Sequence, residues 1–150
     1  MLAIAMLISL NAYAGDEVGV DIRWNLDSDW GEPEFSQYTA INPIQQWRYE
    51  RAHATLIITK TQCQTCAQVS QALVNDYDQQ SDTTAILVNI KGVPGMLSLY
   101  ESPKGVNFRT YVVVKGEYQY EFQLGINESV VDEISFGLER GLLSLINEVI

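Results

Sequence analysis

Two cysteines three residues apart are the residues of this chain best suited to chemistry. They form the motif Cys63-Gln64-Thr65-Cys66 and are the only cysteines among 150 residues. The motif is predicted to lie where a strand gives way to a helix, so Cys63 would meet the unpaired N–H groups and positive dipole of a helix N-terminus. Both favour the thiolate, which attacks disulfides. We therefore expect Cys63 to be the nucleophile and Cys66 to resolve the mixed disulfide.

Two other roles for the cysteine pair stay open beside redox exchange. A structural disulfide here would close a loop of about four residues, which is worth only about 2 kcal/mol in the chain-entropy model. A metal such as Cu(I) would find two soft ligands in the pair, although no second CxxC or pair of histidines completes a site. The only histidine, His53, precedes the first strand of this region and is expected to be a surface residue.

The elements that must position the cysteines are predicted from hydrophobic periodicity. The apolar runs at 54–59 and 84–90 indicate buried strands, and apolar positions spaced by three and four between Cys63 and Gln80 indicate a helix. A strand, a helix and a strand in this order form a βαβ unit, which implies approximately parallel strands.

The rest of the domain is predicted in the same way. A short helix is expected at 94–100, and a hairpin turning at Gly116 is expected to join strands at 110–115 and 118–124. Apolar residues from Val131 to Val149 recur every three or four positions and predict a closing helix, capped by Asn127 or Ser129. Gly137 and Gly141 within it are expected to allow close packing on the sheet. The element order is therefore β-α-β-α-β-β-α.

The chain begins with an apolar run that is typical of a secretory signal. Residues 1–10 are MLAIAMLISL, and Ala12 and Ala14 form the small-x-small pattern before a cleavage site. We predict a signal peptide at 1–14 and a mature protein in an oxidising compartment, either periplasmic or secreted. No apolar run reaches the roughly 18–20 residues of a membrane span, so the mature chain is not expected to be integral to the membrane.

An acidic, aromatic-bearing extension is predicted at 15–43, ahead of the main domain at 44–150. Residues 16–35 carry seven carboxylates against Arg23 alone, and all three tryptophans precede residue 50. Large aromatic side chains in a short extension usually find an apolar surface, so the tryptophans are expected to pack on the domain. A lid or partner-binding arm is the alternative.

Composition narrows the classes of function. The chain is 47% hydrophobic and has a formal net charge of −10, so it can bury a sizeable core and is poorly matched to the phosphate backbone of nucleic acid. Its length is that of about one domain.

With these elements in order, residues 44–150 resemble the thioredoxin-like fold superfamily. The resemblance rests on ATLIITKTQCQTC, on TAILVNI, on RTYVVVKGEYQYEFQLG with its hairpin, and on the amphipathic ending VVDEISFGLERGLLSLI. It implies an α/β fold with a mixed four-stranded sheet and helices on both faces. With the export signal, it implies an exported thiol–disulfide oxidoreductase of the Dsb or TlpA type, without a cofactor, acting on protein thiols and disulfides and on an envelope redox partner.

Three positions depart from the pattern of that superfamily. Arg109 stands where the family has a cis-proline facing the cysteines, Ile57 replaces a buried acidic residue, and Gln62 replaces a tryptophan. If Arg109 faces Cys63, its charge lowers the pKa of that thiol and makes the disulfide more oxidising. Cys63, Cys66 and Arg109 are thus the predicted catalytic residues. The alternative function is a non-catalytic adaptor subunit of an envelope assembly, with a static disulfide.

Overall fold

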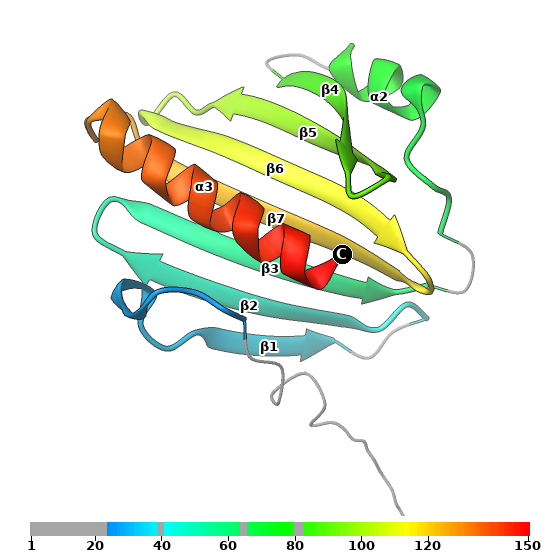
Figure 1. Ribbon diagram of the computed structural model, residues 1–150, viewed down its shortest axis with the longest axis horizontal. Helices are drawn as coiled ribbons and strands as arrows, with labels where there is room; N and C mark the ends of the chain where they lie inside the picture. Colours follow the sequence, from blue (N-terminus) through cyan, green and yellow to red (C-terminus); the bar gives the residue numbers. More distant parts are fainter. Residues whose placement is uncertain (1–23, 39–40, 64–65, 80–82) are drawn as a thin grey trace, which may run out of the picture.

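The computed structural model describes residues 24–38, 41–63, 66–79 and 83–150. The predicted signal peptide at 1–14 and the first part of the extension lie outside the described residues. One seven-stranded antiparallel sheet organises the described chain, in the order β1-β2-β3-β7-β6-β5-β4 (Figure 1). The strands are β1 (Glu34–Tyr38), β2 (Ile44–Arg51), β3 (Ala54–Gln62), β4 (Thr83–Ile90), β5 (Val93–Glu101), β6 (Val106–Lys115) and β7 (Tyr118–Asn127).

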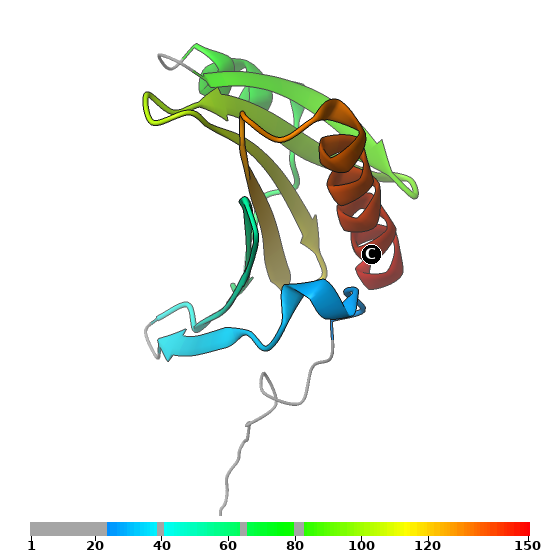
Figure 2. The same ribbon diagram turned by 90° about the vertical axis from the view of Figure 1, so that its left-hand side faces the viewer.

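Within the described residues, two α-helices of different length pack against the sheet. The long helix α3 (Asp132–Val149) lies along one face, which we call the α3 face (Figure 2). The short helix α2 (Gln71–Asp78) contacts the edge strand β4, and we call the face it packs on the α2 face. A single 3₁₀ turn, η1 (Ser28–Trp30), precedes β1. Among the described residues, no helix has both the length and the apolar character needed to cross a membrane.

The main core lies between α3 and the central strands. Alternate residues of each strand point to the same face, so one apolar set from each strand meets the helix. The fully buried members of this core are Trp47, Leu56, Ile58, Val113, Phe122, Leu124, Leu145 and Ile146. A smaller cluster of Val69, Val74, Ala85 and Met96 lies on the opposite face, where α2 packs.

The predicted thioredoxin-like fold is wrong. The strand at 54–59 is present as part of β3 and the strand at 84–90 as β4, but these two strands are not neighbours. β3 pairs antiparallel with β2 and β7, and β4 pairs antiparallel with β5 at the far edge. The helix between them is only eight residues long, and it packs beside β4 instead of bringing β4 back alongside β3.

The predicted short helix at 94–100 is a strand, β5. Its residues Met96 and Ser98 are buried towards α2, while Leu97 packs against the main core on the α3 face. Because both faces of this strand carry apolar side chains, its sequence lacks the alternation that marks a half-buried strand. Lys91 (φ 53°) and Gly92 (φ 85°) form the left-handed two-residue turn between β4 and β5, which is a hairpin signal.

The hairpin and the closing helix are confirmed in position. β6 and β7 turn at Gly116 (φ 62°), and α3 begins at Asp132. The N-cap is Val131, without a side-chain hydrogen bond, so neither Asn127 nor Ser129 caps the helix. The expected close packing of the helical glycines is also wrong, because a Cβ atom at Gly137 or Gly141 would have no neighbour within 4 Å.

The described part of the acidic extension is joined to the core. Trp30 is only 5% exposed, and Trp24 packs edge-on against Trp47 with ring centroids 5.1 Å apart. β1 adds a regular strand to the sheet through its pairing with β2. The expectation that the tryptophans pack on the domain is confirmed for Trp24 and Trp30. The core therefore begins before residue 44.

Candidate functional site

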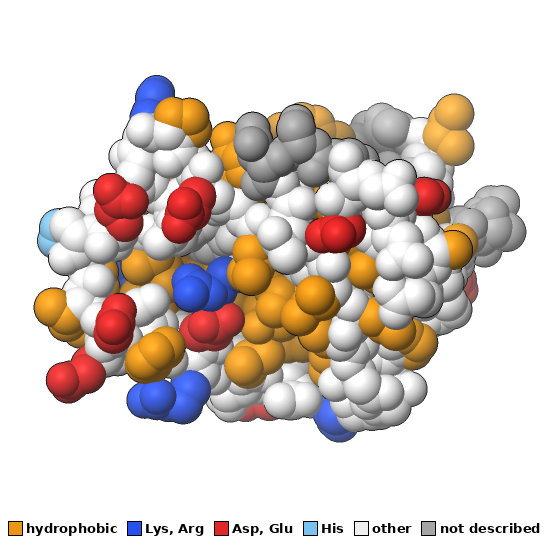
Figure 3. Space-filling model, turned by 90° about the horizontal axis from the view of Figure 1, so that it is seen from above, with side chains coloured by type: hydrophobic (Ala, Val, Ile, Leu, Met, Phe, Trp, Pro, Cys, Tyr) orange, Lys and Arg blue, Asp and Glu red, His pale blue; other side chains and the backbone are white. Residues whose placement is uncertain are grey.

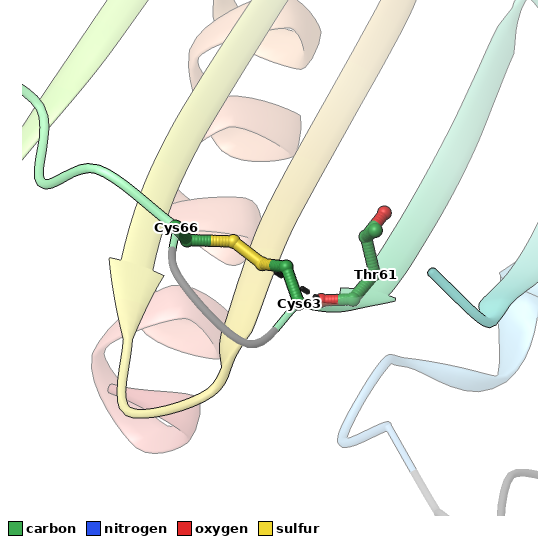
Figure 4. The surroundings of a disulfide bond; sticks show 3 residues. All are labelled: Thr61, Cys63 and Cys66. Atoms are coloured by element: carbon green, nitrogen blue, oxygen red, sulfur yellow. Dashed lines mark hydrogen bonds between the residues drawn. A yellow bond between two sulfur atoms is a disulfide. The ribbon is translucent and has the colours of Figure 1, made fainter. Parts of the chain in front are cut away.

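The cysteine pair lies at the end of the sheet, beside the turn between β6 and β7. Cys63 directly follows β3, and its N–H donates a hydrogen bond to the Glu117 carbonyl oxygen at 2.8 Å. Figure 4 shows its disulfide to Cys66 and the nearby Thr61, whose carbonyl oxygen is 3.9 Å from Cys63 Sγ. Both cysteines are half-buried. The disulfide thus closes the start of the connection between β3 and α2.

The pair is not at a helix N-terminus. α2 begins at Gln71, and the side chain of Ser70 caps it by accepting a hydrogen bond from the Leu73 N–H at 3.2 Å. Cys66 is four residues before that cap, and Cys63 is seven residues before it. The dipole of a helix acts within its first turn. The predicted thiolate stabilisation at Cys63 therefore has no source in α2.

Arg109 is not brought to the cysteines. It lies in β6 six residues before Lys115, which ends the strand near the cysteine turn, and this separation is about 20 Å of extended chain. Its guanidinium Nε lies 3.1 Å from Oε1 of Glu139 in α3, and both side chains are mostly shielded from water. Of the three predicted catalytic residues, the structure brings Cys63 and Cys66 together and leaves Arg109 in a separate site.

A pocket of about 350 Å³ surrounds that separate site. It opens at the edge of the sheet where β4 and β6 begin and β5 ends. Its lining residues include Thr84, Leu99, Glu101, Asn107 and Arg109. Oδ1 of Asn107 is buried without a hydrogen-bond partner in the described structure. A buried acceptor of this kind costs free energy unless a donor reaches it. We call this hollow the Arg109 pocket.

The charges around the Arg109 pocket are largely paired. Glu139 accepts from Arg109, and it also accepts a hydrogen bond from the Tyr111 hydroxyl at 3.3 Å. Burial first, and the charge of Glu139 second, raise the pKa of Tyr111 to about 12. Because Glu139 neutralises Arg109, Glu101 gives the lining of the pocket a net negative charge.

Exposed and half-buried apolar side chains continue from the pocket along the α3 face. Ile86 pairs with Leu97, and Leu97 packs against the core on this face. On α3, Phe136 and Leu143 lie three and four residues from Glu139, so all three share the side of the helix that meets Arg109. We define the apolar strip as Ile86, Leu97, Leu99, Phe136 and Leu143. Figure 3 shows hydrophobic side chains gathered between the helix and the β4 edge, beside a basic and an acidic side chain.

His53 belongs to a second hollow, at the opposite edge of α3. It sits in the turn between β2 and β3 with φ 65°, and it lines a pocket of about 580 Å³ with Arg51, Val131, Ile134 and Asp29. Arg51 is already held by Asp27 and Asp29 and lies over the Trp30 ring. His53 is exposed, as its position in the sequence suggested, and it does not meet the cysteines.

The sequence reasoning missed the Arg109 pocket. Its lining residues come from three strands, and the ion pair beside it joins Arg109 of β6 to Glu139 of α3. The alternation of β6 places Asn107, Arg109 and Tyr111 on one face, but only the pairing with β5 shows that Glu101 joins them. Within the described residues, no group of three or more His, Cys, Asp or Glu side chains forms a metal-binding cluster.

Comparison of the chain with protein-family models, with curated proteins and with solved structures finds no match. These comparisons therefore give no support to a thioredoxin-like family, and the geometry of the Arg109 pocket and of the cysteine turn is what remains to indicate a function.

Proposed function

We propose that this chain is an exported binding protein that holds a segment of a partner protein on the apolar strip. A basic side chain of that segment would enter the Arg109 pocket. The predicted signal peptide and the disulfide support an exported, oxidising location. The cysteine pair then serves as a static clip at the end of β3, in line with the adaptor alternative.

The Glu101 carboxylate in the lining of the Arg109 pocket is the observation that carries this proposal. Arg109, the basic residue of the same lining, is already held by Glu139 of α3. An ammonium or guanidinium group that enters the pocket would pair with the Glu101 carboxylate, and charge-assisted hydrogen bonds of this kind are the strong ones.

The apolar strip supports a protein segment as the occupant. Ile86 is 49% exposed, Leu99 39% and Phe136 56%, and Leu99 also lines the Arg109 pocket. Monomeric proteins seldom leave contiguous apolar surface uncovered, and such surface usually marks an interaction site. The net charge of −10 attracts a basic partner over a longer range.

A titration with a defined peptide tests the proposal. The probe is a fluorescein-labelled ten-residue peptide of alternating Leu and Lys, and the comparison peptide has Glu in place of Lys. We expect the basic peptide to bind, and Glu101→Gln to weaken its binding about fivefold to tenfold. Glu117→Gln removes the same charge at the opposite end of the sheet and should change binding less than about twofold. Equal losses in the two variants would show non-specific charge attraction and contradict the proposed site.

Thiol–disulfide exchange remains the second candidate function, because the Cys63–Cys66 disulfide is only half-buried. Equilibration with glutathione separates the two functions. A reduction potential below about −300 mV marks a static bridge, and the values of catalytic oxidoreductases lie well above it. Catalysis of insulin reduction by the wild type, lost in Cys63→Ser, would favour exchange over the adaptor role.

A further inference from the structure

The edge strand β4 lacks the features that normally keep a strand from pairing with another molecule. Its eight residues, TTAILVNI, include no charge and no proline. Ile86 is 49% exposed on one face and Leu87 42% exposed on the other. The opposite edge, β1, is only five residues long and begins with Glu34. Short length and charge are common protections of sheet edges, and an uncharged, apolar edge is a template for strand addition.

A side-chain cap reveals which backbone groups of β4 point outward. The Ala85 N–H donates to Oδ1 of Asp78 at 2.8 Å, so it points away from β5. Backbone groups alternate in direction along a strand, and therefore the N–H and C=O groups of Leu87 and Asn89 also face the edge. Asp78 covers one end of this edge, and among the described residues β4 pairs with β5 alone, which leaves the part from Leu87 onward open.

We propose that the open part of β4 pairs antiparallel with β4 of a second copy of this chain. The two-fold axis passes through Val88, so that Leu87 and Asn89 of each copy exchange main-chain hydrogen bonds with Asn89 and Leu87 of the other. This register makes four such bonds and leaves the cap of Asp78 on Ala85 in place. A two-fold interface of this type uses the same patch on both subunits and closes as a dimer.

The side chains are complementary in this register. On the α3 face, Val88 stands opposite Val88 of the second copy, and Ile86 stands opposite Ile90, so the face is apolar along the junction. At each end, Ala85 stands opposite the turn residue Lys91 of the second copy, whose ammonium stays on the Asn147 carbonyl oxygen of its own α3 at 2.9 Å. The strand β4 itself adds no charge to the junction, although each chain has a net charge of −10.

The dimer goes beyond the proposed binding function and does not depend on it. The dimer is held by the backbone edge of β4, whereas the partner segment is held by side chains of the α3 face and the Arg109 pocket, and Ile86 is the residue that both surfaces share. A variant at Leu87 lies on the α2 face and leaves that pocket intact.

Sedimentation of the purified chain tests the association. We expect the wild type to be a dimer at micromolar concentration and Leu87→Lys to raise the dimer dissociation constant tenfold or more. The matched control is Leu73→Lys, because Leu73 on α2 has nearly the same exposure, 45%, and lies off the edge. Dimerisation should survive in that control. A monomeric wild type, or equal dimers in both lysine variants, would overturn the proposal.

Cross-linking tests the register. The backbone groups of Val88 point towards β5, so the facing Val88 residues form a non-hydrogen-bonded pair, with Cα atoms about 4.5 Å apart. That distance suits a disulfide. Under mild oxidation, Val88→Cys should form covalent dimers, while Ile86→Cys, whose counterparts are displaced along the strands, should form few. Preferential cross-linking of Ile86→Cys would show that this register is wrong.

Discussion

Arg109 Nε lies 3.1 Å from Oε1 of Glu139, and this ion pair joins the sheet to α3. The Tyr111 hydroxyl donates to the other carboxylate oxygen at 3.3 Å. One carboxylate therefore accepts from two side chains that lie two residues apart on the same face of β6. The charge of Arg109 is used in holding the helix to the sheet, not in activating a thiol.

Removing the arginine tests this assignment. Arg109→Met keeps most of the aliphatic length and leaves Glu139 without its cation, so we expect a loss of about 1–2 kcal/mol in the free energy of unfolding, intermediate between exposed and buried pairs. Urea denaturation measures it. The reduction potential of the Cys63–Cys66 disulfide should stay unchanged. A shifted reduction potential would show that the charge of Arg109 does act on the Cys63–Cys66 disulfide.

The buried phenol of Tyr111 should make the folded protein lose stability at alkaline pH. Burial and Glu139 raise the pKa of this phenol to about 12, above its value of 10.0 in an unfolded chain. The folded state keeps the proton that the unfolded state releases, so the stabilising contribution is complete below pH 10 and is lost as pH rises towards 12. Urea midpoints measured between pH 8 and 12 should fall less steeply in Tyr111→Phe. Equal slopes would contradict the predicted proton linkage.

Trp30 tests how far the core extends into the acidic segment. Its side chain is 5% exposed, and the Arg51 guanidinium lies 5.2 Å from the ring centroid. Trp30→Ala should cost about 3–5 kcal/mol, as is usual for truncating a buried aromatic side chain. Thermal unfolding checks this. A change below 1 kcal/mol would mean that the extension is dispensable for the fold.

Alanine substitutions at Gly125 and at Gly137 should change the stability of the protein in opposite directions. A Cβ atom at Gly125 in β7 would lie 2.8 Å from Phe108 Cε1, so Gly125→Ala should cost about 1–3 kcal/mol through overpacking. Gly137 in α3 has open space around its Cα, and Gly137→Ala should stabilise the protein by about 0.5–1 kcal/mol through helix propensity. Chemical denaturation of the two variants distinguishes them, and a shift of the same sign in both would refute the packing at Phe108.

Replacing Glu121 by glutamine should raise the stability of the protein by an amount that depends on pH. It lies on the α2 face of β7 between Thr59 and Val112, and burial raises the pKa of its carboxyl group. A raised folded-state pKa means that stability is greatest below the unfolded value and is lost as pH rises through the folded value. Glu121→Gln should therefore be more stable than wild type at pH 7, and the difference should shrink below pH 4. A constant difference across that range would exclude titration of Glu121 as its cause.

Elements with local signals could be predicted from the amino-acid sequence alone. β3, β4, the hairpin turning at Gly116 and the helix ending near Val149 follow from runs and periods of apolar residues, because burial of one face imposes its spacing on the chain. The position of the cysteine pair just after a strand was also predictable. A strand with apolar side chains on both faces, such as β5, has no such period, and it was predicted as a helix.

Which strands are neighbours depends on tertiary packing and could not be predicted from local patterns. Local spacing says nothing about whether the strand after Cys63 returns beside β3 or pairs at a distant edge, because that choice depends on contacts between residues far apart in the chain. β3 lies between β2 and β7, so β4 was left to pair with β5 and to form the open edge. The same long-range packing joins Arg109 to Glu139 and separates it from Cys63, which is why the Arg109 pocket is absent from any local pattern.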